Sequence, residues 1–479
     1  MLRFILLSLF ALCVMTNAEL VYASVPLSLH EAIMLAIREN PNVEVAQLNL
    51  TQQKFALHVQ QWQFYPHYSF NVTRTVSRSV IGAYALTSKN TQVQPAVSWL
   101  SPVGTQTIVT SANSFSNHFN PGLSLQVIQP LMRGFGRPIV EAALYNAMDS
   151  EKISKLNVEG TLKTTITAVI NAYLNAVSAE HTVRIDEESL QRAQLSVQQT
   201  KLFIKAGHKA GNELVTVQAD VANAQTTLEN DKNNLKQARF ALLNAIGLDP
   251  DTDVTITNLD VPALIKKYQL PTIMQTKEMA LANDVQYQTE IITFEGATKR
   301  NLQIAEDNTR WQLNLTVNAS TGQGQGAGQN AGIGSLYNGA NTSQSAALNL
   351  QIPIDDQIAK QGVVNAKIAL REASIALKQE KWSKETNAIN GWNSVGSAER
   401  ALVFAESASQ LQQKTYQLSY KKYLYGLIDS IELQSVRGQL IATEQSLVAS
   451  QLNYLTALVN LDLLQGTTLK TWDIKVRYD

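Results

Sequence analysis

The chain has 479 residues, equal numbers of acidic and basic side chains, and only 16% charged residues. The zero net charge provides no basic field for binding nucleic acid, so a nucleic-acid partner is not expected. The low charged fraction is unusual for a soluble helical bundle. It suits a surface that faces a water-filled lumen or another subunit.

Residues 1–23 are predicted to be a secretory signal peptide. Met1-Leu2-Arg3 gives a short basic start, an apolar run follows, and Ala23 ends a small-residue cleavage pattern. Cleavage after Ala18 is the alternative. The apolar run is too short to span a membrane.

Cys13 is the only cysteine and lies within this apolar run. Lipid attachment at Cys13 is the alternative to a plain signal peptide, but the bulky Leu12 before it disfavours that reading. The mature chain is then expected to lack disulfides, thiolate metal sites and cysteine nucleophiles.

The first half of the mature chain, 24–247, is predicted to contain two helices, two strands and a long helical hairpin. Apolar spacing indicates helices at about 29–40 and 42–63. Period-two alternation indicates strands around Tyr68–Thr73 and Leu123–Val127. Residues 79–120 are polar without clear periodicity and are predicted to be a long exposed loop.

The second half, 274–466, repeats this order. Helical spacing from about 276 to 309 is followed by alternation near 313–319 and 348–352, separated by a segment rich in Gly, Gln and Asn, 321–345. Residues 248–273 are predicted to link the two repeats, and 467–479 to form a C-terminal tail. The sequence therefore predicts an internal duplication.

Two stretches without proline, 139–249 and 354–479, permit unusually long helices. In the first, Leu162, Ile166, Val169, Tyr173 and Val177 form a narrow coiled-coil-like seam. A helix over 138–205 would be about 100 Å long. Turns are predicted near 205–211 and 425–427.

Two strands per half give four per chain, which are too few to close a barrel. Several chains are therefore expected to pool their strands, and three would give twelve. Aromatic residues gather at the strand ends and fit either a membrane girdle or a plug at the junction between barrel and helices. They are Trp62, Phe64, Tyr65, Tyr68 and Trp311.

At this point the sequence resembles the TolC family of outer-membrane efflux proteins over nearly the whole mature chain. The resemblance rests on residues 31–41, the weaker repeat at 279–284, the paired strand–proline–helix units, and residues 425–434. It implies an α+β membrane protein: a homotrimer whose 12-stranded β-barrel in the outer membrane, four strands per chain, continues into a long α-helical barrel in the periplasm.

The resemblance also implies a function. Members are passive export ducts, not enzymes, and need no cofactor or metal. The implied partners are a periplasmic adaptor protein, an inner-membrane transporter and outer-membrane lipid. Members serve drug efflux, metal efflux or type I protein secretion, and the exported substrate is not specified. A non-conducting periplasmic coiled-coil scaffold or adaptor is the alternative function.

Site residues are carried over from the family by position. Its periplasmic gate has acidic residues that match Glu432 and Ser435, and Asp429 lies one helical turn from Glu432. Three copies of a carboxylate around an axis would attract cations. The alternative is that Asp429 and Glu432 simply favour the start of a helix.

Adaptor contact in the family uses the glycine-containing hairpin turns. Tyr425, Gly426 and Leu427 match that pattern at the second turn, and Gly207 and Gly211 are placed at the first. The first turn is expected to be about three residues longer than the family pattern, with Thr216 where an acidic residue is expected.

Other motifs are weak. The glycine-rich run 322–328 lacks the following helix and the Lys-Ser/Thr pair of a phosphate-binding loop, so an exposed loop is expected. The six histidines show no metal-ligand spacing, and no catalytic constellation is evident.

Overall fold

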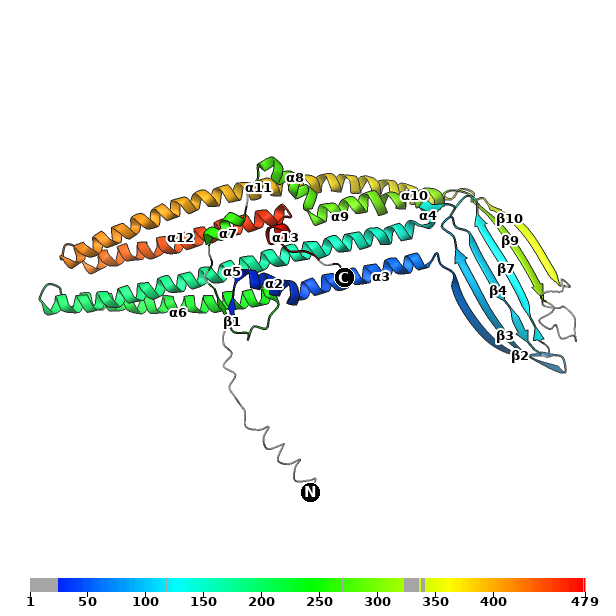
Figure 1. The fold of residues 1–479 in the computed structure, drawn as a ribbon, viewed down its shortest axis with the longest axis horizontal. Helices are drawn as coiled ribbons and strands as arrows, with labels where there is room; N and C mark the ends of the chain where they lie inside the picture. Colours follow the sequence, from blue (N-terminus) through cyan, green and yellow to red (C-terminus); the bar gives the residue numbers. More distant parts are fainter. Residues whose placement is uncertain are drawn as a thin grey trace, which may run out of the picture. The chain divides into compact units, whose positions relative to one another are not determined.

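Figure 1 shows the computed structural model of the chain, which describes residues 25–116, 119–257, 259, 261–268, 270–322, 336, 341–476 and 478. The chain divides into two compact units, and each takes segments from both halves of the sequence. The helical unit comprises Met1–Glu44, Thr161–Thr276 and Ala388–Lys475; the sheet unit comprises Val45–Gly160, Lys277–Asn387 and Val476–Asp479.

Some predictions lie outside these observations. The predicted signal peptide, 1–23, and most of the glycine-rich segment 321–345 are not among the described residues. The boundaries proposed for the two sequence repeats, the linker and the tail stay predictions, because the compact units cut across them.

The helical unit is built from two long helical hairpins and shorter elements between them (Figure 1). Its helices, two of which continue into the sheet unit, are α2 (Leu29–Glu39), α5 (Ala142–Lys205), α6 (Glu213–Ile246), α7 (Val261–Lys267), α11 (Gln357–Leu424), α12 (Ser430–Leu464) and α13 (Thr468–Thr471). The strands β1 (Val25–Leu27) and β8 (Val254–Ile256) pair in parallel. The predicted long helices and both predicted turns are confirmed.

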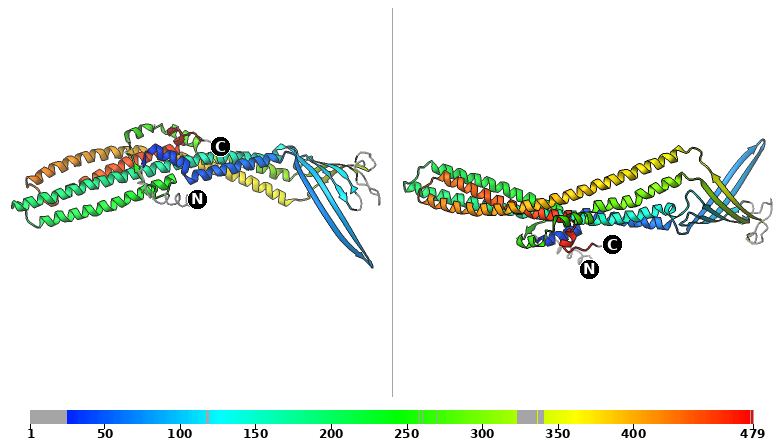
Figure 2. Two further views of the ribbon diagram at one scale, coloured as in Figure 1. Left: turned by 60° about the horizontal axis from the view of Figure 1, so that its bottom comes forward. Right: turned by 90° about the horizontal axis from the view of Figure 1, so that it is seen from above.

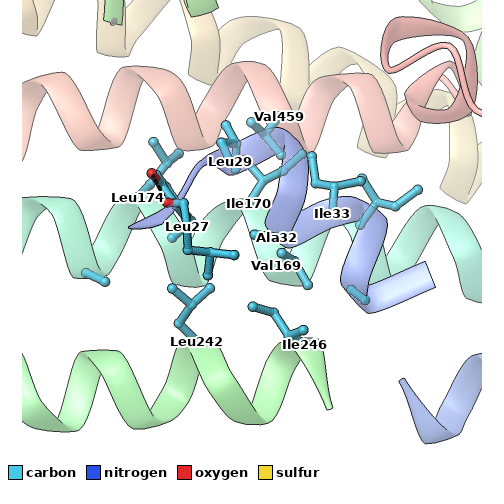
Figure 3. Close-up of a cluster of buried hydrophobic side chains, with 14 of the residues drawn as sticks. Leu27, Leu29, Ala32, Ile33, Val169, Ile170, Leu174, Leu242, Ile246 and Val459 are labelled. Carbon is cyan, nitrogen blue, oxygen red and sulfur yellow. Dashed lines mark hydrogen bonds between the residues drawn. The ribbon is translucent and has the colours of Figure 1, made fainter. Parts of the chain in front are cut away.

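The main core of the helical unit surrounds α2 (Figure 3). A capping box starts this helix: the Ser28 side chain accepts from the Glu31 N–H, and Glu31 reaches back to Ser28. Ala32 and Ile33 then pack against the seam of α5, where Ile166 and Val169 are fully buried. The predicted coiled-coil-like seam is therefore part of the core.

The sheet unit contains a sheet and several helices. The helices are α3 (Pro41–Trp62), α4 (Arg137–Val140), the beginnings of α5 and α11, α8 (Ile273–Asn283), α9 (Val285–Thr293), the π-turn η1 (Phe294–Thr298) and α10 (Lys299–Asn308). Asp149 of α5 forms an ion pair with Arg300 of α10. Gly296 leaves room for this pair, because a Cβ there would collide with the Asp149 carboxylate.

The sheet has eight strands in the described residues, all antiparallel to their neighbours. They are β2 (His67–Ile81), β3 (Tyr84–Leu100), β4 (Gln106–Ser111), β5 (Asn113–Phe115), β6 (Phe119–Asn120), β7 (Gly122–Pro130), β9 (Gln312–Gly322) and β10 (Thr342–Gln351). Strands β2 and β10 form the two edges (Figure 1).

The prediction of two strands in the first half, and hence four per chain, is wrong. Residues 79–120, predicted to be a loop, contain the end of β2 and all of β3, β4, β5 and β6. Residues 87–92 are Thr, Ser, Lys, Asn, Thr and Gln, so both faces of β3 are polar there and period two has no apolar signal. Pro95 inside β3 also argues against a strand.

The eight strands amount to six long ones. Strands β4 and β5 pair with β3 in one continuous register that skips only Pro95 and Gln94. Proline has no N–H to donate, so an interruption opposite Pro95 is expected. Strands β6 and β7 likewise follow one register against β5 and β4, interrupted at Pro121.

The register places apolar side chains of all six long strands on one face, because residues directly opposite each other share a face. This apolar face comprises Tyr68, Phe70, Val72, Val93, Pro95, Val97, Val109, Leu123, Leu125, Val127, Leu313, Leu315, Val317, Ala346, Leu348 and Leu350. The opposite, polar face carries mainly Ser, Thr, Asn and Gln, and its large apolar exceptions are Ile81, Tyr84, Leu86, Leu100, Ile108 and Ile128.

The aromatic residues at the strand ends are largely exposed in the single chain. The side chains of Trp62, Tyr65, Tyr68 and Trp311 all face outward. The junction between α3 and the sheet is instead held by Trp99, whose indole N–H donates to the Phe64 carbonyl oxygen at 3.1 Å. The girdle and the plug both stay predictions for these aromatic residues.

Candidate functional site

The predicted gate and adaptor residues lie at the two turns that close the helical hairpins (Figure 1). Gly207 and Gly211 lie between α5 and α6, and Tyr425, Gly426 and Leu427 lie between α11 and α12. All five are exposed. The structure therefore presents both predicted adaptor segments on the surface of the helical unit.

The helices before the two turns, α5 and α11, end in the same way. Gly207 and Gly426 have positive φ angles of 73° and 70°. The next residue donates its N–H to a carbonyl five residues back, from His208 to Phe203 and from Leu427 to Lys422, each at 2.9 Å. This is the Schellman arrangement, and its left-handed position explains why glycine stands there.

By the helix bounds the first turn has seven residues, 206–212, and the second has five, 425–429, but key positions are spaced alike. Gly207 is followed after three residues by Ala210, and Gly426 after three residues by Asp429 (207 to 210 and 426 to 429). Three residues further on are Glu213 and Glu432. The expectation that the first turn is about three residues longer than the family pattern stays a prediction.

The turns differ in how the second helix starts. The Asp429 carboxylate accepts from the Glu432 N–H at 2.8 Å and caps α12, which begins at once with Ser430. The Ala210 side chain has no acceptor for a cap. The N–H groups of 213–215 donate to carbonyls three residues back, and α6 begins only at Glu213. The predicted capping role of Asp429 is confirmed.

The three predicted gate residues share one exposed face of α12. Asp429, Glu432 and Ser435 are spaced by three residues, which places them above one another on a helix. All three are exposed in the single chain. Asp429 caps the helix, whereas the Glu432 carboxylate and the Ser435 hydroxyl face outward from the single chain.

Tyr423 joins the ends of the two hairpins. Its side chain is fully buried, and its hydroxyl lies 2.9 Å from the Thr200 hydroxyl of α5. The Phe203 ring packs edge-on against it at 5.8 Å, and the Lys209 ammonium lies 4.2 Å from the ring centroid. Lys209 also forms an ion pair with Glu213 at 2.8 Å.

A second connection lies further along α6 and α12. The Asp220 carboxylate accepts from the Gln434 amide at 3.1 Å and forms an ion pair with Arg437. Arg437 is buried, and burial, aided by the nearby Arg192, lowers its pKa to about 10. It is therefore charged at neutral pH and depends on Asp220 for compensation.

A polar cavity of about 420 Å³ adjoins this ion pair, and Asp186 of α5 lines it. The Asp186 side chain is buried and accepts from the Gln445 amide at 3.4 Å. Burial, together with the neighbouring Asp231 carboxyl, raises the pKa of Asp186 to about 7. This group is thus partly protonated at neutral pH.

Replacing Asp186 with asparagine is expected to stabilise the protein at alkaline pH. Folding raises the pKa of this carboxyl, so the ionised form costs the folded state free energy. This cost is absent below about pH 4 and complete above about pH 7. We expect Asp186→Asn to raise stability at pH 8 by on the order of 1–3 kcal/mol and to leave it nearly unchanged at pH 4.

Thermal unfolding followed by circular dichroism at pH 4, 6 and 8 measures this effect. Asp253→Asn, at an exposed position, is the matched control and should follow the parent at every pH. If the unfolding midpoints of Asp186→Asn and the parent changed equally with pH, the raised pKa of Asp186 would be contradicted.

No group of three or more His, Cys, Asp or Glu side chains in the described ranges is arranged to hold a metal ion. His208 lies exposed at the first turn, and His118 is outside the described residues.

The sequence matches the family model of outer membrane efflux proteins over residues 32–248. The chain therefore resembles outer membrane efflux proteins over just under half of its length. It is an outer-membrane protein, and the family is one of channels rather than enzymes. No curated protein sequence matches it significantly.

Solved outer-membrane channels share the fold of this efflux protein. The Campylobacter jejuni CmeC channel is 13% identical with a TM-score of 0.68, over 91% of this chain and 85% of that one. The open state of the Neisseria gonorrhoeae MtrE channel is 17% identical with a TM-score of 0.67, over 91% and 88%. Vibrio cholerae VceC is 13% identical with a TM-score of 0.67, over 91% and 96%.

One helix in the described part of the efflux protein, α12, is long and apolar enough to cross a membrane by length and composition alone. A third of its most apolar window (33%) is buried inside the chain, and core helices of soluble proteins meet the same criterion. Among its apolar residues, Leu433, Leu440 and Leu458 are buried.

The sequence analysis missed Tyr423, Asp220, Arg437 and Asp186. A signal for Arg437 was present, because Leu433, Arg437 and Leu440 follow the four-then-three spacing of a buried helix stripe. A charged residue within such a stripe needs a partner. The partner itself, Asp220, lies more than 200 residues away and had no local signal.

Proposed function

We propose that this efflux protein is an outer-membrane export duct formed by three copies of the chain. It docks on a periplasmic adaptor and an inner-membrane pump to expel small molecules or secrete proteins. The observation that carries the proposal is the sheet with one apolar and one polar face in a chain that also forms helices of 64 and 68 residues. An apolar face suits lipid and a polar face suits a water-filled lumen.

The hairpin turns are proposed as the adaptor contact. Tyr425 and Leu427 are 81% and 72% exposed, although both are large apolar side chains. Exposed apolar residues of this size at a turn mark an interaction surface. Gly207 and Gly211 allow the same close approach at the first turn.

The gate is proposed at the exposed face of Asp429, Glu432 and Ser435. If three copies present this face to a common axis, their carboxylates favour cations in the narrow opening. Asp429 has a structural task as the cap of α12, so Glu432 is the residue whose charge is free for this role.

Glu432→Gln is expected to lower the cation preference of single channels in planar bilayers several-fold, measured as a reversal potential in a KCl gradient. Asp429→Asn is the control for the cap, because asparagine caps as well as aspartate while removing one charge. An unchanged reversal potential in Glu432→Gln would contradict the gate assignment.

The scaffold or adaptor alternative predicts a water-soluble particle. It explains the hairpins but assigns no role to the apolar face of the sheet. Extraction separates the two functions: the duct requires detergent and conducts ions, whereas the scaffold does neither.

A further inference from the structure

The β2–β3 hairpin is an integral part of the sheet. Strand β3 pairs with β2 over fifteen residue pairs, from His67↔Ser98 to Ile81↔Tyr84, and with β4 over five, from Ala96↔Thr110 to Leu100↔Gln106. The apolar face continues through both strands: Phe70 lies opposite Pro95, and Val97 opposite Val109. The hairpin therefore has the same two-faced character as the other four long strands.

Both edges of this six-stranded sheet are open. Every residue of β10 is exposed, as is every residue of β2 after His67. Neither strand contains proline, and β10 carries no charged residue. The β2 edge carries Arg74 and Arg78 as its charged residues. A long edge without proline, which in β10 is also uncharged, lacks main features by which proteins prevent edge pairing, so both edges are available for pairing.

The directions of the two edges suit pairing between copies. The long strands alternate in direction, so the first and last of an even number run opposite ways. The β2 edge of one chain can then bond the β10 edge of the next in the antiparallel manner of its other pairs. Repetition of this contact closes a ring without any unpaired edge.

We infer that all six long strands join the barrel wall, so that a second copy of this chain pairs its β10 with β2, and three copies form an 18-stranded barrel. The inference rests on the proposed trimeric duct and replaces the predicted twelve strands. Eighteen lies within the even strand numbers of outer-membrane barrels. Barrel diameter grows roughly linearly with strand number, so this barrel is about one and a half times as wide as a 12-stranded one.

Charged residues on the hairpin fit this placement. Arg74, Arg78 and Lys89 share the apolar face, beyond the apolar residues and towards the turn at Gly82. No Asp or Glu occurs between residues 67 and 131 or between 312 and 352. Figure 2 shows this hairpin reaching past the ends of the other strands. Basic residues that follow an apolar band on the lipid side match the level of anionic head groups.

Cysteine cross-linking tests the closure. Cys13 lies in the predicted signal peptide and is the only cysteine, so introduced cysteines are the only thiols of the mature chain. Ala347→Cys on the polar face of β10 is combined with one cysteine on the polar face of β2. The β2 positions are Ser69, Asn71, Thr73, Thr75 and Ser77.

The matched set combines Ala347→Cys with a cysteine at Gln106, Ile108 or Thr110 on the polar face of β4. Strand β4 would be the edge of a 12-stranded barrel if the β2–β3 hairpin lay outside the wall. After oxidation in membranes, non-reducing gels show whether chains are joined covalently, and native mass gives the number of copies separately.

We expect covalent dimers and trimers from at least one β2 position and none from β4. Cross-links through β4 alone, in a trimer, would overturn the inference and leave the duct intact. Absence of cross-links from both sets would also overturn it, because a closed wall must pair through one of these edges. A particle that is not trimeric would instead overturn the proposed function. The barrel width measured in electron micrographs is a second, independent test of the strand number.

Discussion

Tyr423→Ala will loosen the ends of the two helical hairpins more than any other single truncation at the turns. The tyrosine is fully buried, and its removal leaves Phe203 and Thr200 without their shared partner. Truncating a buried aromatic residue to alanine costs about 3–5 kcal/mol. Hydrogen exchange measured by mass spectrometry should rise sharply over residues 196–213 and 418–432.

Tyr423→Phe is the matched control. It keeps the ring against Phe203 and beneath Lys209 and removes only the hydroxyl contact with Thr200. The expected cost is about 1 kcal/mol, with little change in exchange. If Tyr423→Ala exchanged no faster than Tyr423→Phe, the ring would not be what joins the hairpins.

Arg437→Met is expected to destabilise the packing of α6 against α12 by about 3–5 kcal/mol. The substitution preserves much of the side-chain volume but removes the positive charge beside the largely buried Asp220 carboxylate, to which the Gln434 amide still donates. Breaking a buried ion pair from one side is costly because the other charge stays buried. The midpoint of thermal unfolding should fall accordingly.

The double substitution Arg437→Met with Asp220→Asn tests the origin of this cost. Removing both charges should recover a large part of the lost stability, which gives a coupling energy in a double-mutant cycle. Additive losses in the double variant would mean that the two residues act independently, and the ion pair would not explain the effect.

The helical part of the fold followed from local signals. Missing proline permitted α5 and α11, glycine at 207 and 426 predicted where they end, and the seam from Leu162 to Tyr173 is buried. These features act within a few residues, so a single sequence contains them. The family resemblance then predicted the membrane and the export function.

The prediction of the strands failed for a physical reason. A strand with one buried face shows alternating apolar and polar residues. A stretch that is polar on both faces shows no such alternation. Residues 87–92 of β3 are of this second kind, and their pairing with β2 is visible only in the register. The predicted count of four strands was too low because of this segment.

The site was predicted in part. Asp429 was identified as either cap or gate, and the structure shows the cap. Tyr423 and Asp220 owe their importance to contacts with α5 and α12 that are remote in sequence. Contacts of this kind depend on how the hairpins pack and leave no periodic trace.

The central claim is that three copies of this chain form an ion-conducting duct in the outer membrane. The most direct test is the native mass of the detergent-extracted particle, followed by single-channel recording from the same preparation. The account predicts a trimer with discrete conductance steps. A water-soluble particle, or a detergent-extracted one without conductance, would contradict it.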